Sequence, residues 1–209
     1  HRSEIRVEGA QHRGIVLVAA PGCDGGAEHR QRLVAQCRGR PGLLRHRAAQ
    51  LTGILNGIDT ETWNPATDRH LPHHYGPRRL EDKAGNKAAL QAEMGLAVRA
   101  DLPLLAVVSR LTEQKGLDLF LDVAARTLAL PAQIVVLGSG AHALEHGWTA
   151  FAHRHPEQCA VRIGFDDTLA HLIEGGADMF LMPSRYEPCG LNQMYSLKYG
   201  TVPIVRKTG

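Results

Sequence analysis

The feature that most constrains the fold is a regular alternation of apolar runs and amphipathic segments from about Pro103 onward. Residues 103–109 form a continuous apolar run that ends in a polar corner, which is typical of a strand covered on both faces. The next segment has apolar residues at the spacing of one helix face: Leu117, Phe120, Leu121, Ala124 and Leu128. The alternation continues with strands predicted at 132–140, 159–164, 177–184 and 201–205, and helices at 141–155, 167–176 and 190–200. This order predicts an α/β fold, a doubly wound parallel sheet with right-handed crossovers and helices on both sides.

Length and composition indicate a globular protein. The chain has 209 residues, 44% of them hydrophobic and 22% charged, which suits one domain or a domain with an appendage. A net charge of +3 does not demand an acidic macromolecule as a partner. Residues 1–47 are rich in arginine and contain no lysine. Such basic stretches can contact nucleic acid or membrane, but a solvated surface is the favoured interpretation, so we assign this stretch no function.

Cysteine usage and hydropathy favour a soluble cytoplasmic protein. The four cysteines are scattered without a C-x-x-C pair, which is typical of reduced thiols: Cys23, Cys37, Cys159 and Cys189. No apolar run reaches the roughly 20 residues that span a bilayer. Residues 14–22 faintly resemble the core of a signal peptide, but they are short, and a strand is the better interpretation.

Ligands of open parallel sheets bind beyond the carboxyl ends of the strands. Here that rule selects three loops, 109–116, 137–140 and 183–191, at one edge of the predicted sheet. In the first loop, Arg110 offers a planar fork of donors and Lys115 a mobile charge, a combination suited to a diphosphate. The amides at the start of the following helix add a favourable potential for an anion. Two solvated loop charges are the alternative, which we disfavour because of the loops' position.

The second loop, "LGSG", is too short to be specific. It lacks the glycine spacing of a dinucleotide fingerprint and of a P-loop. Gly138 and Gly140 are explained equally well by a tight turn. We keep both as candidate substrate-binding residues only because they lie at the ligand edge.

The third loop, "PSRYEPCGL", is the most informative. Gly190 opens a helix and lets a ligand approach backbone amides closely. Glu187 would repel a phosphate, so beside an anion site it is suited to accept hydrogen bonds from hydroxyls of the same ligand. Phosphate and hydroxyls together indicate a sugar phosphate or a nucleotide sugar. Cys189 has no local histidine to activate it as a nucleophile, so we favour a backbone or packing role.

Four long motifs occur in order and resemble one family. They are "ILNGIDTETWNPATD" at 54–68, "NKAALQAEMGL" at 86–96, "VVSRLTEQKGLDL" at 107–119 and "MPSRYEPCGLNQMYSLKYGTVPIVRKTG" at 182–209. Together they are similar to bacterial glycogen synthases, which use ADP-glucose, and to plant starch synthases. The resemblance covers about Gly42 to Gly209 and corresponds to the second lobe of a two-lobed GT-B glycosyltransferase with a Rossmann-like sheet.

The resemblance implies retaining transfer of glucose from ADP-glucose to the non-reducing end of an α-1,4-glucan. Arg110 and Lys115 would neutralise the departing diphosphate, and Glu187, the first position of an E-x7-E pattern, would hold glucose hydroxyls. It also implies the substrate-binding residues: Cys189, Gly190 and Leu191 through the backbone, Tyr195 at the second position of the pattern, Asn56 and Asp59 near the interlobe cleft, and Phe165 near the adenine, where the family often has tyrosine. It implies no cofactor beyond the donor, no metal, and neither nucleic acid nor a membrane as partner.

The sequence also departs from the family. The first lobe, with its lysine-containing glycine-rich loop, a histidine of the catalytic region and much of the acceptor site, has no counterpart in this sequence. We therefore predict three regions: an unmatched basic segment at 1–41, an interlobe connection at 42–100, and a nucleotide-sugar-binding lobe at 101–209 that is truncated at its end. The unmatched segment is a divergent remnant, a translation of the wrong frame or a genuine appendage.

Twelve histidines raise the question of a metal site. His142 and His146 are four residues apart on a predicted helix, but a pair is half a zinc site, and no glutamate of an H-E-x-x-H motif accompanies them. The remaining clusters, His153 with His155 and the group in "HLPHH" (His70, His73 and His74), are explained as solvated imidazoles.

Three functional hypotheses remain. The first is the donor-binding half of a glucan synthase, which would need an N-terminal lobe for turnover. The others are another GT-B transferase that uses a UDP-sugar, and a non-catalytic module that binds a nucleotide sugar or a glucan.

Overall fold

A computed structural model describes residues 15–19, 51–187 and 189–208, with side chains from Asn56 onward. The chain divides into two units, which we describe separately: the first takes in residues up to Gly57 with 188–191 and 209, and the second takes in 58–187 with 192–208. Most of the arginine-rich stretch, together with Cys23 and Cys37, lies outside the described residues.

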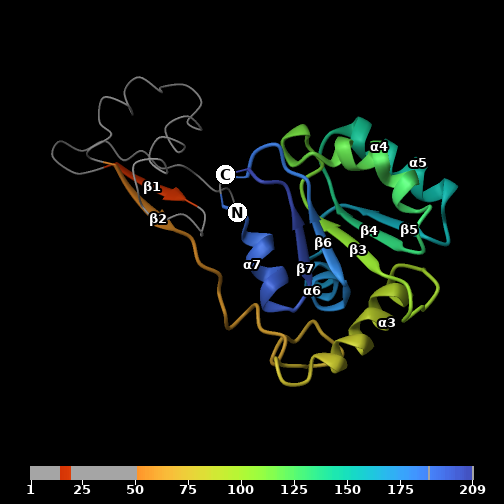
Figure 1. Cartoon of the computed structure of the whole chain (residues 1–209), viewed down its shortest axis with the longest axis horizontal. Helices are drawn as coiled ribbons and strands as arrows, with labels where there is room; N and C mark the ends of the chain where they lie inside the picture. Colours follow the sequence, from red (N-terminus) through yellow and green to blue (C-terminus); the bar gives the residue numbers. More distant parts are fainter. Residues whose placement is uncertain (1–14, 20–50, 188, 209) are drawn as a thin grey trace. The chain divides into compact units, whose positions relative to one another are not determined.

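The second unit is built on a five-stranded parallel sheet (Figure 1). Its strands are β3 (Leu104–Val108), β4 (Gln133–Gly138), β5 (Cys159–Ile163), β6 (Met179–Met182) and β7 (Val202–Val205). Its helices are α3 (Lys83–Glu93), α4 (Leu117–Thr127), α5 (His142–Arg154), α6 (Asp167–Gly176) and, except for its first residue, α7 (Leu191–Lys198), with 3-10 turns η2 (Leu80–Asp82) and η3 (Glu113–Lys115). The alternation predicted from Pro103 onward is confirmed element by element.

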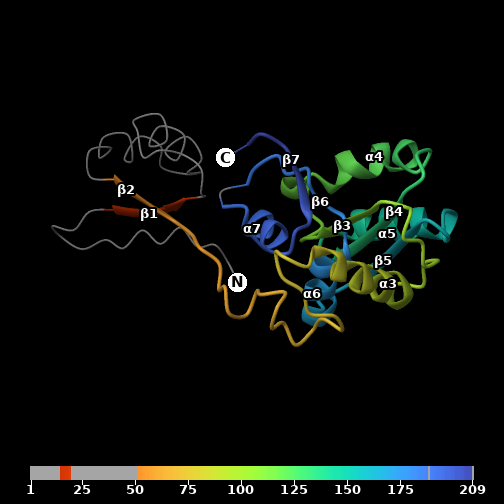
Figure 2. The same ribbon diagram turned by 60° about the horizontal axis from the view of Figure 1, so that its bottom comes forward.

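Each face of the sheet packs against its own helices (Figures 1 and 2). Alternate side chains of β3 point to opposite faces, as the pleat requires. Leu104 and Ala106 join the core formed with α3 and α6, whereas Leu105 and Val107 join the core formed with α4 and α5. The predicted stripe of α4 faces the second core, with Leu117, Phe120, Ala124 and Leu128 buried and Leu121 partly buried. The doubly wound α/β fold is therefore confirmed.

The strand order fixes where a ligand can bind. The order across the sheet is β5-β4-β3-β6-β7, so the chain moves outward in one direction from β3 and then returns to place β6 on the other side of β3. This is the order of dinucleotide-binding Rossmann folds, and ligands of such folds bind where the order reverses. The reversal lies between β3 and β6, which are followed by residues 109–116 and 183–187.

Helix α3 packs on the sheet through polar side chains. Its buried residues are Lys83, Asn86, Lys87, Leu90 and Gln91. The Lys83 ammonium donates to the backbone oxygens of Glu174 and Gly175 and to Thr201 Oγ1, at 3.0, 2.8 and 2.8 Å. Burial lowers the pKa of Lys83 to about 7, although the nearby carboxylates act in the opposite direction. Backbone carbonyls thus accept the hydrogen bonds that the buried polar side chain would otherwise donate to water.

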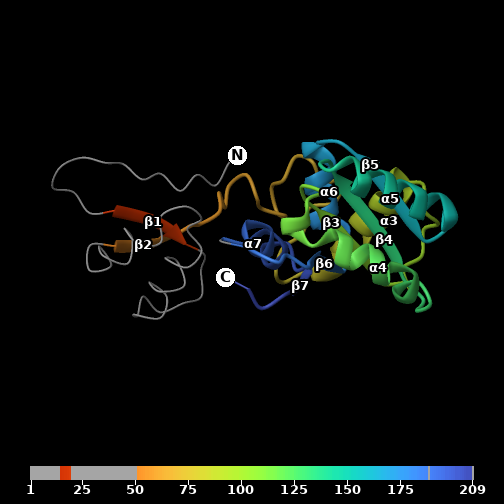
Figure 3. The same cartoon turned by 90° about the horizontal axis from the view of Figure 1, so that it is seen from above.

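In the first unit, β1 (Ile15–Ala19) and β2 (Leu51–Leu55) lie side by side (Figure 3). They pair in parallel, with Ile15 opposite Leu51. β1 confirms the strand predicted at 14–22. None of the helices in the described part of the chain has the length and apolar character that crossing a bilayer requires.

Candidate functional site

Two residues predicted to bind a ligand meet at the reversal of strand order. Lys115, the last residue of η3 after β3, places its ammonium 2.5 Å from Glu187 Oε2 in the loop after β6. Both side chains are largely buried, with 22% and 15% of their surfaces exposed. Ser184 Oγ donates to the same carboxylate oxygen at 3.1 Å. The loops after β3 and β6 therefore bring a cation and an anion to one point at the carboxyl edge of the sheet.

Arg110 is connected to the same loop through a glutamine. Its guanidinium donates to Gln114 Oε1 at 3.5 Å, and Gln114 Nε2 donates to the backbone oxygen of Tyr186 at 3.2 Å. The backbone of Gln114 also accepts from the amide of Arg185 at 2.9 Å. Since Arg110 is exposed, its charge can turn toward an anion at the edge of the sheet. Arg110, Lys115 and Glu187 thus lie on one rim, as the sequence predicted.

An ion pair that the sequence analysis did not single out holds the two loops together. Arg185 forms two hydrogen bonds of 2.6 Å with the carboxylate of Asp118 on α4, and it also donates to the backbone oxygen of Glu113. The hydrogen bonds from Arg185 lower the pKa of the Asp118 carboxyl. Planar, doubly bonded pairs of this kind fix orientation as well as distance. Arg185 therefore positions the turn that carries Lys115.

Gly116 allows the same two loops to touch. Its φ is 68°, a left-handed conformation that favours glycine. A Cβ on Gly116 would lie 2.2 Å from the backbone oxygen of Pro183, which is far inside contact distance. No pattern in the sequence assigns Gly116 a role within the candidate loop 109–116.

Gly138 and Gly140 are required by close packing. Gly138 ends β4 and Gly140 forms a parallel bridge with Leu111, and a Cβ on them would lie 1.9 Å from Ser109 O and 2.3 Å from Leu111 O respectively. Leu111 N donates to Ser139 O, and Ala141 N donates to Leu111 O. The loop after β4 thus continues the backbone pairing past the end of β3 and supports the segment that carries Arg110.

Two other candidate residues lie apart from the ion pair in the fold. Phe165 follows β5, which is two strands away from β3 on the same edge, and its side chain is 89% exposed. Asp59 accepts hydrogen bonds from the backbone amides of Glu61 and Thr62 and from the Thr62 hydroxyl. Those bonds, that from the Thr62 amide foremost, lower the pKa of Asp59. Asp59 organises its own turn, whereas Phe165 offers an open aromatic face.

Tyr195 belongs to an aromatic stack. The centroid of its ring lies 3.9 Å from that of Trp63, and Trp63 also stacks on His171 at 3.8 Å. His171 Nδ1 in turn contacts buried Asp68 Oδ2 at 2.7 Å, and Tyr199 donates its hydroxyl to the same oxygen at 2.5 Å. Burial opposes ionisation of Asp68, but the bonds from Tyr199 and His171 outweigh it, and the pKa of the carboxyl is lowered.

The remaining candidates lie in the first unit. Asn56 Nδ2 donates to Cys189 Sγ at 3.0 Å, and the thiol is 8% exposed, which agrees with a packing role for Cys189. Gly190 has φ of 70° and immediately precedes Leu191, the first residue of α7. The predicted glycine at the start of this helix is confirmed.

Comparison with known proteins identifies the family. Residues 95–209, which contain both loops of the ion pair, match the model of "Glycosyl transferases group 1". The chain belongs to the group 1 glycosyltransferases. This family assignment agrees with the reversal point of the sheet, where Lys115 and Glu187 meet.

Within the group 1 glycosyltransferases, the similar curated proteins are glycogen synthases. The chain is 65% identical over 167 residues to that of Dechloromonas aromatica, covering 80% of this chain and 34% of the relative. It is 60% identical over 167 residues to that of Anaeromyxobacter dehalogenans, covering 80% and 35%. The chain therefore spans about a third of the length of the curated relatives it matches. The resemblance inferred from the four motifs is confirmed.

Solved structures of glycosyltransferases agree with this family assignment. The catalytic domain of starch synthase IV from Arabidopsis thaliana, bound to ADP and acarbose, superposes with a TM-score of 0.82 at 33% identity, covering 93% of this chain and 40% of that one. A glycosyltransferase from Rickettsia africae superposes with a TM-score of 0.63 at 13% identity, covering 94% and 45%, and supports the fold alone.

Proposed function

We propose that this chain forms the donor-binding part of a glycogen synthase, which transfers glucose from ADP-glucose, with retention, to the non-reducing end of an α-1,4-glucan. The observation that carries the proposal is the meeting of Lys115 with Glu187 where the strand order reverses. The identities of 65% and 60% to glycogen synthases support the reaction, and the ADP in the starch synthase structure supports the nucleotide.

The proposed mechanism uses an exchange of partners. In the structure, Lys115 is paired with Glu187. In the complex, the ammonium turns to the diphosphate, and the released carboxylate accepts hydrogen bonds from hydroxyls of the glucose. Arg110 adds a second cation to the diphosphate. As the bond between the anomeric carbon and the diphosphate oxygen breaks, negative charge grows on that oxygen, and the two cations stabilise it.

The other candidates have supporting roles in this proposal. Exposed Phe165 offers a ring on which the adenine can stack. The acceptor glucan and a complementary N-terminal lobe are the proposed partners. We propose a cytoplasmic enzyme that uses no metal or other cofactor for transfer.

Calorimetric titration with ADP-glucose tests the donor assignment. Arg110→Ala and Lys115→Ala should each weaken binding by about tenfold, because each removes a charged contact of about 1.5 kcal/mol with the diphosphate. Arg99→Ala is the matched control, since Arg99 pairs with Asp101 ahead of β3, at the opposite edge of the sheet. Unchanged affinity in both loop variants would reject the diphosphate assignment.

Two further measurements separate the alternatives. Tighter binding of UDP-glucose than of ADP-glucose would favour a UDP-sugar transferase. Incorporation of labelled glucose into glycogen, measured with this chain alone and with an added N-terminal lobe, distinguishes an enzyme part from a binding module. If a complemented protein binds ADP-glucose without incorporation, the module is the better description.

A further inference from the structure

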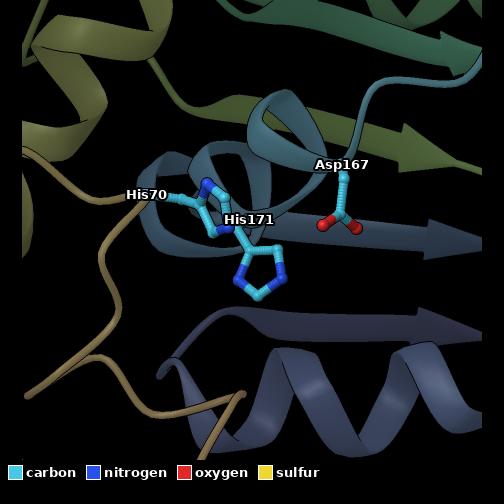
Figure 4. A group of neighbouring side chains, drawn as sticks. All are labelled: His70, Asp167 and His171. Atoms are coloured by element: carbon cyan, nitrogen blue, oxygen red, sulfur yellow. The ribbon is translucent and has the colours of Figure 1, made fainter.

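A second group of side chains gathers at α6. It consists of His70, Asp167 and His171, and one ligand atom from each lies within 4.8 Å of the others. Asp167 and His171 are four residues apart on α6 and so share one face of that helix. Figure 4 shows the two imidazoles beside one another, with the Asp167 carboxylate to one side of them.

Each imidazole has a hydrogen-bond partner at Nδ1. His171 Nδ1 lies 2.7 Å from Asp68 Oδ2, and His70 Nδ1 lies 3.1 Å from Thr168 Oγ1. In the described part of the chain, no hydrogen bond uses His171 Nε2. A carboxylate that holds one ring nitrogen so that the other can bind a metal is the usual support of a metal-binding histidine.

One of the three side chains is held in place, and the other two are exposed enough to adjust their positions. His171 is 2% exposed and stacks on Trp63, so its position is fixed. His70 is partly exposed and Asp167 is exposed, so their side chains can move by the small amount that coordination requires. Zn²⁺ binds histidine nitrogen and carboxylate oxygen at about 2.0–2.2 Å, with four ligands in a tetrahedron.

We propose that His70, Asp167 and His171 form a Zn²⁺ site with water as the fourth ligand. The donor set favours Zn²⁺ over Mg²⁺, because Mg²⁺ prefers an octahedron of oxygen ligands. Bound metal would tie the segment around His70 to the first turns of α6. None of its three ligands is a residue proposed to bind the donor, and its test needs no transfer activity.

Two nearby groups oppose a cation, and they bear on the expected affinity. Arg69 Nε lies 3.4 Å from His70 Nε2, so the arginine must move away when the metal binds. The positive end of the α6 dipole is also close to Asp167. Reversible binding that chelators remove is therefore expected.

The test is calorimetric titration of the full chain with Zn²⁺, using protein purified without a polyhistidine tag and treated with chelator. The expected result is one tight site per chain. The double variant His70→Gln/Asp167→Asn should lose at least tenfold in affinity for that site. Asp68→Asn should also weaken it, by about 10- to 100-fold, because it removes the support of His171 without removing a ligand.

The matched control is His142→Gln/His146→Gln. These two exposed histidines are also four residues apart, on α5, and their replacement should leave the tight site unchanged. Co²⁺ provides a second readout, because a tetrahedral site gives visible absorption that the His70→Gln/Asp167→Asn variant should lack. Wild-type Zn²⁺ affinity in that variant, or no Zn²⁺ binding by the native chain, would overturn the proposal.

Discussion

Replacing Glu187 by glutamine should change the binding of the diphosphate and of the hexose of the proposed donor in different ways. The Glu187 carboxylate is paired with the ammonium of Lys115 at 2.5 Å. A diphosphate must displace that carboxylate before it can bind Lys115. Glu187→Gln removes the competing charge, so we expect ADP, which has no hexose, to bind more tightly to the variant than to the native chain. ADP-glucose should gain less, because glutamine is a poorer acceptor for the sugar hydroxyls.

The magnitude follows from the burial of the pair. With 22% and 15% of the side chains exposed, water screens the interaction only in part. A hydrogen bond to a charged group contributes about 1.5–3 kcal/mol, and glutamine retains an acceptor oxygen, so about 1.4 kcal/mol should be released. This corresponds to a decrease of about tenfold in the Kd for ADP.

The assay is calorimetric titration with ADP and with ADP-glucose at one fixed, moderate ionic strength, since salt screens charges near the surface. Glu113→Gln is the matched control, because Glu113 is exposed on the same 3-10 turn and carries the same charge. The control should change the Kd for ADP by less than about twofold. Unchanged or weaker binding of ADP to Glu187→Gln would refute the exchange of partners.

Three further predictions concern the framework of the site. Gly116→Ala should weaken ADP-glucose binding and lower the thermal midpoint of unfolding, because the added Cβ would lie 2.2 Å from the Pro183 backbone oxygen. An unchanged affinity and an unchanged thermal midpoint would refute the close approach. Lys83→Met should lower the free energy of unfolding, measured in urea titrations, by about 3 kcal/mol, because buried acceptors lose their donor. The control Lys198→Met, on the exposed face of α7, should change that free energy little. Equal effects of the two substitutions would contradict this prediction. Because the pKa of Asp68 is lowered in the folded protein, its ionised carboxylate should stabilise the fold at pH values above the ordinary carboxyl pKa of 3.8. This stabilisation should be lost as the pH falls through the pKa of Asp68 in the folded protein. In native protein the urea midpoint should therefore decrease between about pH 5 and 3, and in Asp68→Asn this decrease should be smaller.

The sheet and the rim of the site could be predicted because their signals are local. Apolar runs of strand length reveal a strand wherever both faces are covered, as in β3 and β4. The place of Lys115 and Glu187 follows from a rule about parallel sheets, which needs only the order of elements along the chain.

Helix α3 could not be found in the same way. Its buried face is mostly polar, with Lys83, Asn86, Lys87 and Gln91 beside Leu90, so apolar periodicity is weak there. These side chains are buried because backbone carbonyls from distant segments accept their hydrogen bonds, as Ala100 O and Leu102 O do for Lys87. Such partners become visible only when the chain is folded.

The same limit applies to the residues that position the site. Arg185 and Asp118 are 67 residues apart, and in the sequence each is an ordinary loop or helix charge. His171 was likewise overlooked among twelve histidines, because its importance comes from Asp68, 103 residues away. Pairs of this kind require the topology as well as the pattern.

Strand order explains why Lys115 and Glu187 can meet at all, although 72 residues separate them. Neighbouring strands are about 4.8 Å apart. If the strands followed one another across the sheet in chain order, β3 and β6 would be separated by three such spacings, roughly 14 Å, well beyond the reach of an ion pair. The return of the chain to the other side of β3 makes the two strands neighbours, with Leu105 opposite Met179. The ion pair is therefore a consequence of the reversal in topology, and a substitution that shifts β6 relative to β3 should disturb it as surely as one that removes either charge.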